Sequence, residues 1–388
     1  MELRQGYKHT EAGIIPKDWK ATTLGKFLAL QRGHDLTERD RRPGNIPVMG
    51  SAGPNGFHDT ALVRGPGIVL GRSGASFGQA HYCPSDFWPH NTALYVTDFF
   101  GNDRRFAFYF LQAIDFTRHN SGGAQQSLNR NFIAPIPVGI PRLREQEAIA
   151  GALSDADALI ESLEQLIAKK RHLKEGATHE LLTGNKRLRG SSAAWDVKQV
   201  REFADCVSGG TPSTLRPEYW GGSIRWMSSG ELNLRRVNEV QGRITQEGLR
   251  NSSAKMIPAG CVLIGLAGQG KTRGTAAVNM VALCTNQSIA AILPTAAFAS
   301  EYLYHNLDAR YQELRELSAG GGGRGGLNLT LIRSLPVPFP SLPEQTAIAT
   351  VLSDMDAEIA ALETKLAKAR QIKQGMMQNL LTGRIRLV

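Results

Sequence analysis

Residues 265–272 read GLAGQGKT, which matches the Walker A pattern of a phosphate-binding loop at every fixed position. In such a loop the backbone N–H groups cradle phosphates, the lysine contacts them and the hydroxyl residue ligates magnesium. An apolar run, Cys261–Ile264, precedes the glycines, as a P-loop requires. These residues raise the question of nucleotide hydrolysis.

The residues that follow argue against a P-loop. A Walker A motif opens a helix whose N-terminus faces the phosphates. Residues 273–293 instead combine alternating apolar and polar residues with short apolar runs, which is typical of strands. No apolar run ending in aspartate follows to hold magnesium. We therefore expect a glycine-rich hairpin that carries Lys271 and Arg273. A nucleotide hydrolase remains the alternative enzymatic reading.

Other catalytic patterns have weaker support. Glu363-Thr364-Lys365 downstream of Asp354 resembles a nuclease pattern, but these residues lie in a segment with coiled-coil spacing. The sequence contains no HExxH, no GxSxG, no Asn-Pro-Pro-Tyr quartet and no spaced Cys/His set. We therefore predict no catalytic site and no metal site in this chain, and no cofactor bound by it.

Composition points to a polyanionic partner. The 388 residues are enough for two or three domains, and the formal net charge is +10. Such a charge favours nucleic acid, with an unspecialised basic surface as the alternative. The polar N-terminal residues do not resemble a signal peptide, and no apolar run approaches the roughly 20 residues that span a bilayer. The four cysteines form no CxxC pair, which argues against a zinc site or a disulfide scaffold. We expect a cytoplasmic protein.

An internal repeat organises the chain. Residues 145–188 and 344–387 align without a gap at an offset of 199 and share 24 of 44 positions. The offset also relates SLNRNFIAPIPV at 127–138 to GLNLTLIRSLPV at 326–337. The Walker-like residues correspond to GRSGASFGQA, which lacks Gly-Lys-Thr. The chain is therefore a tandem of a globular domain and a long helix, each present twice.

Both helical copies carry apolar residues at alternating spacings of three and four, the pattern of a coiled-coil seam. The pattern shifts later to Leu173, Ala177 and Leu181, with equivalents in the second copy. Each seam needs a partner, and we expect the two helices to pack on each other; packing of each helix on its own domain is the alternative. The seam residues, also candidates for docking a partner, are Ile149, Leu153, Ile160, Leu163, Ile348, Leu352, Ile359 and Leu362.

Taken together, the repeat predicts an α+β protein: two mixed α/β domains, two long helices and pseudo-two-fold symmetry. We place the first globular domain, with an N-terminal arm, at 1–138 and the first helix at 139–190. The second domain follows at 191–339 and the second helix at 340–388.

The order of these motifs resembles the specificity subunit of type I restriction–modification systems. The resemblance rests on P-x-L-x-E-Q-x-A-I-A at 141–150 and 340–349, on LSDxDAxI, and on LLTG at 181–184 and 380–383. It covers essentially the whole chain, and the duplication makes it specific.

The resemblance implies a non-catalytic subunit with two target recognition domains, each reading one half of a bipartite DNA site. It implies that the helices form an antiparallel coiled coil, set the gap and dock two modification subunits, which use S-adenosylmethionine to methylate adenine. It also implies restriction subunits that use ATP and magnesium. A coiled-coil scaffold that ignores DNA is a further alternative.

Candidate DNA-contacting residues are long basic, amide or hydroxyl side chains in glycine-rich or charged loops, because such loops approach DNA closely. Arginine reads guanine, and asparagine or glutamine reads adenine. The candidates in the first domain are Arg39, Arg41, Arg42, Arg72, Ser73, Gln79, Gln125, Gln126 and Arg130; those in the second are Arg235, Arg236, Gln269, Lys271, Arg273, Arg324 and Asn328.

Overall fold

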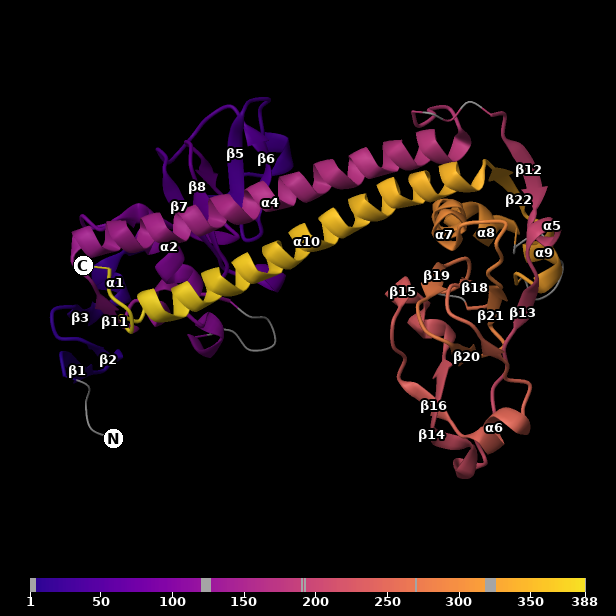
Figure 1. The fold of residues 1–388 in the computed structure, drawn as a ribbon. Coiled ribbons are helices and arrows are strands. Elements are labelled where there is room, and N and C mark those ends of the chain that lie inside the picture. The colour runs from indigo at the N-terminus through magenta and orange to yellow at the C-terminus, as the bar shows by residue number, and fades with distance from the viewer. Residues whose placement is uncertain are drawn as a thin grey trace. The chain divides into compact units, whose positions relative to one another are not determined.

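The computed structural model describes residues 5–119, 127–189, 191, 193–268, 271–317 and 326–387. The chain divides into two compact units, each built from one globular domain and parts of both long helices (Figure 1). The first unit is Met1–Gln165 with Glu363–Val388, and the second is Leu166–Leu362. The mixed α/β content and the paired long helices confirm the predicted fold class.

The first unit holds a four-stranded sheet in the order β4-β10-β7-β8 and a three-stranded sheet in the order β6-β5-β9. Two short pairs, β1-β2 and β3-β11, complete it. Its elements are β1 (Tyr7–Thr10), β2 (Gly13–Pro16), β3 (Lys20–Thr23), α1 (Leu24–Phe27), β4 (Ala29–Arg32), η1 (Glu38–Asp40), β5 (Ile46–Gly50), β6 (Gly53–His58), β7 (Gly67–Gly71), η2 (Gly74–Ser76), β8 (Ala80–Cys83), β9 (Trp88–Pro89), β10 (Ala93–Asp98), α2 (Arg104–Ala113), η3 (Phe116–His119), α3 (Arg130–Ile133) and β11 (Pro137–Ile140).

The second unit repeats this plan with a five-stranded sheet, β13-β21-β18-β19-β15, and a four-stranded sheet, β16-β14-β20-β17. Its short pair β12-β22 matches β3-β11. Its elements are β12 (Asp196–Gln199), α5 (Val200–Phe203), β13 (Cys206–Ser208), η4 (Pro217–Tyr219), β14 (Trp220–Met227), η5 (Ser229–Leu234), β15 (Arg236–Val237), β16 (Gly242–Ile244), α6 (Gln246–Arg250), β17 (Met256–Ile257), β18 (Val262–Gly265), β19 (Ala276–Asn279), β20 (Leu283–Thr285), β21 (Ile289–Ile292), α7 (Ser300–Ala309), α8 (Tyr311–Leu317), α9 (Leu329–Ser334) and β22 (Pro336–Phe339).

Each main sheet is built around a strand with no exposed face. All five residues of β7 and all four of β18 are buried, as expected for apolar runs covered on both sides. Helix α2 covers the first sheet with an apolar stripe that includes Phe106 and Phe110. Asp103 caps this helix, because its carboxylate accepts the N–H of Phe106 at 2.7 Å. These side chains belong to the core of the first unit.

The two long helices are α4 (Leu143–Thr183, 41 residues) and α10 (Leu342–Leu380, 39 residues). At 1.5 Å per residue each is about 60 Å long. Gly184 and Gly383 follow them with φ of 75° and 71°, the left-handed backbone with which glycine ends a helix. Among the described residues, no helix is long and apolar enough to cross a membrane.

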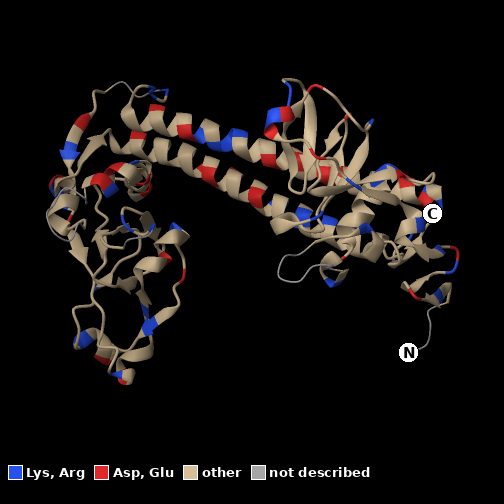
Figure 2. Ribbon diagram, turned by 180° about the vertical axis from the view of Figure 1, so that it is seen from behind, with Lys and Arg blue, Asp and Glu red and all other residues tan. Residues whose placement is uncertain are grey.

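Ion pairs show that the helices run antiparallel within each unit. In the first unit Asp157 binds Lys373 at 2.6 Å and Glu164 binds Arg370 at 2.6 Å, so one residue number rises as the other falls. In the second unit Lys170 binds Glu358 at 2.6 Å and Lys174 binds Asp356, again in opposite order along the two helices. Figure 2 shows acidic and basic residues interspersed along both helices, which suits such pairing. The antiparallel arrangement implied by the resemblance is confirmed.

The apolar seam is buried where the helices meet their domains. Ile149 and Leu153 lie in the core of the first unit, and Ile348 and Leu352 lie in the core of the second. The remaining four are buried or half-buried: Ile160, Leu163, Ile359 and Leu362. Their burial suits the coiled-coil seam that the sequence predicts, and docking of a partner by these residues stays a prediction.

The predicted continuation of the seam is wrong at two equivalent positions. Leu173 is 50% exposed and Ile372 is 52% exposed. The neighbouring lysines face the other helix instead, where Lys174 pairs with Asp356 and Lys373 pairs with Asp157. Adjacent residues of a helix lie about 100° apart, so the apolar side chains turn outward.

A buried glutamate ties each long helix to its globular domain. In the first unit Glu145, which is 4% exposed, accepts the indole N–H of Trp19 at 3.0 Å. It also accepts two hydrogen bonds from Arg386, at 2.6 and 2.9 Å. Arg386 follows the end of α10 and binds Asp18 as well, at 2.7 Å. One carboxylate therefore joins the first turn of α4, the start of β3 and the tail of α10.

The second unit contains the same arrangement, in which the glutamate and the arginine keep the offset of 199. Glu344 accepts the indole N–H of Trp195 at 3.1 Å and two hydrogen bonds from Arg187, at 2.7 and 2.8 Å. The next residue of each motif holds the domain helix, because Gln146 accepts the N–H of Asp103 and Gln345 accepts that of Ala299. These contacts explain why Glu-Gln recurs in both copies.

We predict that Glu145→Ala destabilises the protein by about 3–5 kcal/mol, because it leaves Arg386 without its buried partner. Thermal or denaturant unfolding measures this effect. Glu147→Ala is the matched control, since Glu147 is exposed on the same turn and its loss should change stability by no more than about 0.5 kcal/mol. Equal effects of the two substitutions would contradict the assignment.

The second glutamate predicts a pH dependence. The Arg187 guanidinium holds the pKa of the Glu344 carboxyl below its usual value, whereas the unfolded chain keeps a glutamate pKa of about 4.3. Because the folded pKa is the lower one, the pair stabilises the fold above about pH 4.3 and loses this effect as the pH falls through the folded pKa. Between about pH 5 and about pH 3, the melting temperature should fall more steeply for wild type than for Glu344→Gln. Parallel curves of melting temperature against pH for the two proteins would show that the Glu344–Arg187 pair does not contribute to the pH dependence of stability.

Candidate nucleic-acid interface

Three loops of the first unit meet at one edge of its sheets. Ser51, directly after β5, accepts the backbone N–H groups of Arg72 at 3.2 Å and Ser73 at 3.4 Å with its hydroxyl oxygen. The same hydroxyl donates to the carbonyl of Thr92, in the turn between β9 and β10. Ser73 also forms a β-bridge with Ser127, and the N–H of the following Leu128 bonds to the carbonyl of Arg72. The ends of β5, β7 and β9 are thereby joined to the segment before α3.

The second unit joins the equivalent loops. The N–H of Leu327 bonds to the carbonyl of Leu266 at 3.1 Å, and the N–H of Leu266 bonds to the carbonyl of Ser288 at 2.8 Å. Asn286 in turn donates its N–H to the carbonyl of Met227 at the end of β14. Each domain therefore gathers the same set of loops at one edge, a surface suited to contacting a ligand.

The Walker-like residues lie in one of these loops and form no P-loop. β18 and β19 pair antiparallel on either side of them, so the loop joins the arms of a hairpin and the element that follows is a strand. Gly274 has a φ of 79°, and the carbonyl of Lys271 accepts the hydroxyls of Thr275 at 2.6 Å and Tyr311 at 3.1 Å. Without a helix N-terminus the phosphates of a nucleotide have no cradle. The predicted hairpin is confirmed, and the side chain of Lys271 is exposed on it.

The structure brings some of the first domain's candidates together. Arg72, Ser73 and Gln79 share the loop between β7 and β8, and Arg130 opens α3, just after the segment joined to that loop.

Other candidates of that domain are placed differently. Arg41 donates to the carbonyl of Asn55 at 2.7 Å, and Arg42 forms an ion pair with Asp59 at 2.6 Å. Arg39 is exposed on η1. Contact between any of these side chains and DNA stays a prediction.

In the second domain two of the candidate arginines, Arg235 and Arg236, have acidic partners. Arg235 binds Asp308, and Arg236 binds Glu301 at 2.5 Å while stacking over Tyr304. Lys271 and Arg273 lie in the hairpin loop. Asn328 caps α9 with its side-chain oxygen. Gln125, Gln126, Gln269 and Arg324 lie outside the described residues.

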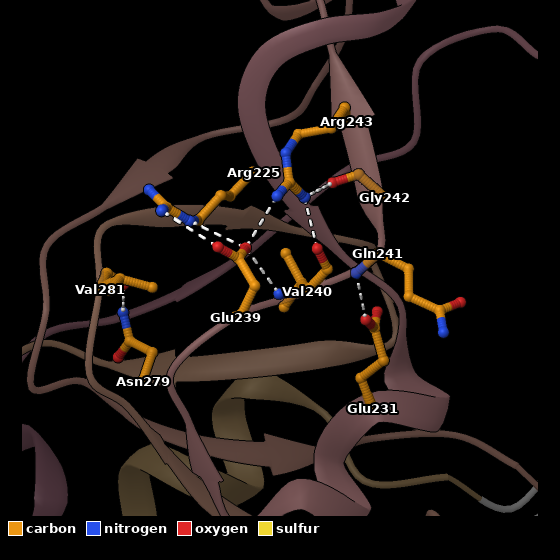
Figure 3. Close-up of polar contacts among 9 residues, drawn as sticks. All are labelled: Arg225, Glu231, Glu239, Val240, Gln241, Gly242, Arg243, Asn279 and Val281. Carbon is orange, nitrogen blue, oxygen red and sulfur yellow. Dashed lines mark hydrogen bonds and ion pairs between the residues drawn. The ribbon is translucent and has the colours of Figure 1, made fainter.

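Sequence reasoning missed a pair of arginines on the second domain. Arg225 on β14 and Arg243 on β16 lie directly opposite each other in the sheet, and both bind Glu239, at 3.0 and 2.8 Å (Figure 3). Hydrogen bonding from Arg225 is the main cause that lowers the pKa of Glu239 to about 2. The cluster keeps a net positive charge with both guanidinium groups oriented. No local signal reveals it, because the carboxylate reaches β14 from a separate loop.

The LSDxDA motif has an internal role that the sequence did not reveal. In the first unit Tyr109 of α2 donates to Asp157 at 2.7 Å and contacts Ser154 at 3.3 Å, while Lys373 binds the same aspartate. In the second unit His305 replaces the tyrosine and lies 3.0 Å from the hydroxyl of Ser353. The motif therefore fastens the domain helix and the opposite long helix to one turn.

The described part of the chain contains no cluster of three or more histidine, cysteine or carboxylate side chains that could hold a metal. The four cysteines, Cys83, Cys206, Cys261 and Cys284, are buried as free thiols. Burial raises the pKa of Cys83 and Cys261 to about 12, so these thiols are protonated near neutral pH and do not act as nucleophiles.

Comparison with known proteins identifies relatives of both halves. The family described as type I restriction modification DNA specificity domain matches residues 16–169 and 193–371. The MjaIX type I restriction enzyme specificity subunit of Methanocaldococcus jannaschii is 33% identical over 167 residues, which are 42% of this chain and 38% of that protein. The EcoR124I/EcoR124II specificity subunit of Escherichia coli is 28% identical over 181 residues, 46% of this chain and 45% of that protein. The chain therefore matches less than half the length of these relatives.

Solved structures share the fold. A type I restriction–modification S subunit from M. genitalium superposes with a TM-score of 0.65 at 16% identity, covering 98% of each chain. A chain from a study of complex assembly and conformational transition of the type I R-M system gives a TM-score of 0.56 at 15% identity, covering 96% of this chain and 99% of that one. Because the family matches most of the sequence in two successive segments, this chain belongs to the type I restriction–modification DNA specificity family.

Proposed function

We propose that this chain is the DNA-binding specificity subunit of a type I restriction–modification complex and carries no catalytic step itself. Each domain reads one half of a bipartite, asymmetric duplex site. One observation carries the proposal: the two domains share a frame of buried contacts, whereas the loops gathered at its edge differ in their side chains. A duplicated frame with unlike reading loops suits a target whose halves have different sequences.

The charge distribution supports DNA as the ligand. The chain has a net charge of +10, and arginines or lysines stand in or beside the loop edge of each domain, including Arg72 and Lys271. Phosphate contacts by such side chains position a protein on DNA, and contacts with base edges give specificity. Neutralised phosphates release counterions, so binding should weaken steeply as salt rises.

The long helices suit the function of setting the gap. Each helix is about 60 Å long, and ion pairs such as Asp157–Lys373 and Lys170–Glu358 fix the register of the pair within each unit. Two-fold arrangements on DNA place half-sites about one helical turn, roughly 10 bp, apart from centre to centre. We therefore propose two half-sites of about 3–5 bp with an unread gap between them.

The duplication also supports two copies of one partner. Leu143 and Leu342, at equivalent positions in the first turns of the long helices, are 47% and 43% exposed. Each unit has a groove between the end of one long helix, the domain helix and the adjoining strand, with Leu182 and Pro336 in one and Leu381 and Pro137 in the other. We propose that two modification subunits dock on these matched surfaces.

The remaining partners and cofactors follow from the family. S-adenosylmethionine would bind to the modification subunits, and ATP with magnesium to restriction subunits that join the complex. The target is chromosomal or invading duplex DNA, so we propose that the complex works in the cytoplasm.

Methylation mapping tests the proposal. The chain is expressed with its modification subunit in a host without other adenine methylation, and modified adenines are located by sequencing. We predict one bipartite motif with a fixed gap, which disappears when the chain is omitted. DNA binding by the purified complex should fall about 10³–10⁵-fold between 50 and 200 mM salt if six to ten phosphates are contacted. An assembled complex that methylates nothing and does not retain DNA would instead favour a protein scaffold.

A further inference from the structure

A tight turn at the loop edge presents a carboxamide in both domains. In the first unit the turn joins β9 to β10: the N–H of His90 bonds to the carbonyl of Met49 at 2.8 Å, and that of Ala93 to His90 at 3.0 Å. In the second unit the turn joins β20 to β21: the N–H of Asn286 bonds to Met227 at 3.0 Å, and that of Ile289 to Asn286 at 3.3 Å. The residue that follows His90 in the first turn is Asn91, and the residue that follows Asn286 in the second turn is Gln287.

A glycine segment packs against each turn. His34 donates its N–H to the carbonyl of Pro89 at 2.8 Å, and Gly210 donates to that of Thr285 at 2.9 Å. The preceding residues, Gly33 and Gly209, lie so close to the turn that a Cβ on either would collide with backbone carbonyl oxygens. Only glycine fits there, and the close approach sets the next side chains beside the carboxamides.

In the first unit this neighbour is Asp35. The side-chain NH₂ of Asn91 donates to the Asp35 carboxylate. A carboxylate at neutral pH only accepts hydrogen bonds, so this contact fixes which end of the carboxamide faces it. The side-chain oxygen of Asn91 and the second hydrogen of its side-chain NH₂ group remain for a ligand. Arg72, at the same edge, reaches the backbone carbonyl of Asn91 at 3.4 Å.

In the second unit the neighbour is Thr211. Its hydroxyl donates to the side-chain oxygen of Gln287 at 2.6 Å. The side chain of Gln287 is exposed, and one lone pair of its oxygen and both N–H hydrogens remain for a ligand. Both carboxamides therefore keep an acceptor and a donor, and a neighbour holds each of them in orientation.

We propose that Asn91 and Gln287 are specificity-determining residues that each read an adenine, one in each half-site. An adenine edge in the major groove offers the N6 amino group as donor and N7 as acceptor, which a carboxamide matches with two hydrogen bonds. Asp35 and Thr211 are positioning residues that orient the two readers. This inference rests on the proposed DNA recognition and names residues that loop composition alone did not single out.

The test compares Asn91→Ala and Gln287→Ala in the chain co-expressed with its modification subunit, with methylation motifs mapped for wild type and both variants. Each variant should accept other bases at one adenine position of one half-site, with discrimination there reduced roughly 5- to 150-fold. The half-site of the other domain should stay unchanged, so each variant is the other's control for folding and assembly.

Three results would overturn the inference: unchanged motifs, a loss of methylation that is uniform across all targets, or relaxation at a position that is not adenine. Absence of any motif with the wild-type chain would instead contradict the proposed function itself. Should Asn91→Ala not assemble with its partner, Asp35→Ala carries the test, since it retains Asn91 but frees its carboxamide to rotate. The Asp35→Ala variant should show reduced base discrimination at the same adenine position, and an unchanged motif would again overturn the assignment.

Discussion

The structure depends on a buried carboxylate that has to be neutralised. Glu145 and Glu344 open the long helices inside the protein, and an unpaired charge there would cost several kcal/mol. Each is satisfied by an indole from its own domain and a guanidinium from beyond the end of the other long helix. A domain, the start of one helix and the tail of the other must therefore assemble together. The adjacent glutamine extends this constraint to the domain helix.

This constraint separates the frame of the protein from its reading loops. Contacts at the helix starts and at the LSDxDA turns recur in both units, even where His305 replaces Tyr109. The loops at the sheet edges keep the same backbone bonds but carry different side chains, as at Asn91 and Gln287. Under the proposed function, a frame that tolerates new loop side chains would allow the target sequence to change without loss of the fold.

Much of this organisation was predictable from the sequence because it is local or repeated. The helices, their glycine caps and the hairpin at GLAGQGKT follow from periodicity, glycine placement and the alternating residues after the loop. Ion pairs were not predictable, since Arg235 meets Asp308 across 73 positions of sequence. Leu173 was misplaced because an apolar repeat does not reveal that its neighbour Lys174 faces the other helix. Asn91 could not be singled out from the sequence because its surroundings are formed by three segments that lie apart in the sequence.

We propose that the long helices determine the gap between the half-sites, while the domains determine the bases. Its most direct test is to map the methylation motif before and after removal of one turn, four residues, from the middle of each long helix (164–167 and 363–366). The account predicts the same bases in both half-sites with a shorter gap, or loss of methylation where the shortened complex no longer fits its DNA. An active variant with an unchanged gap would contradict it.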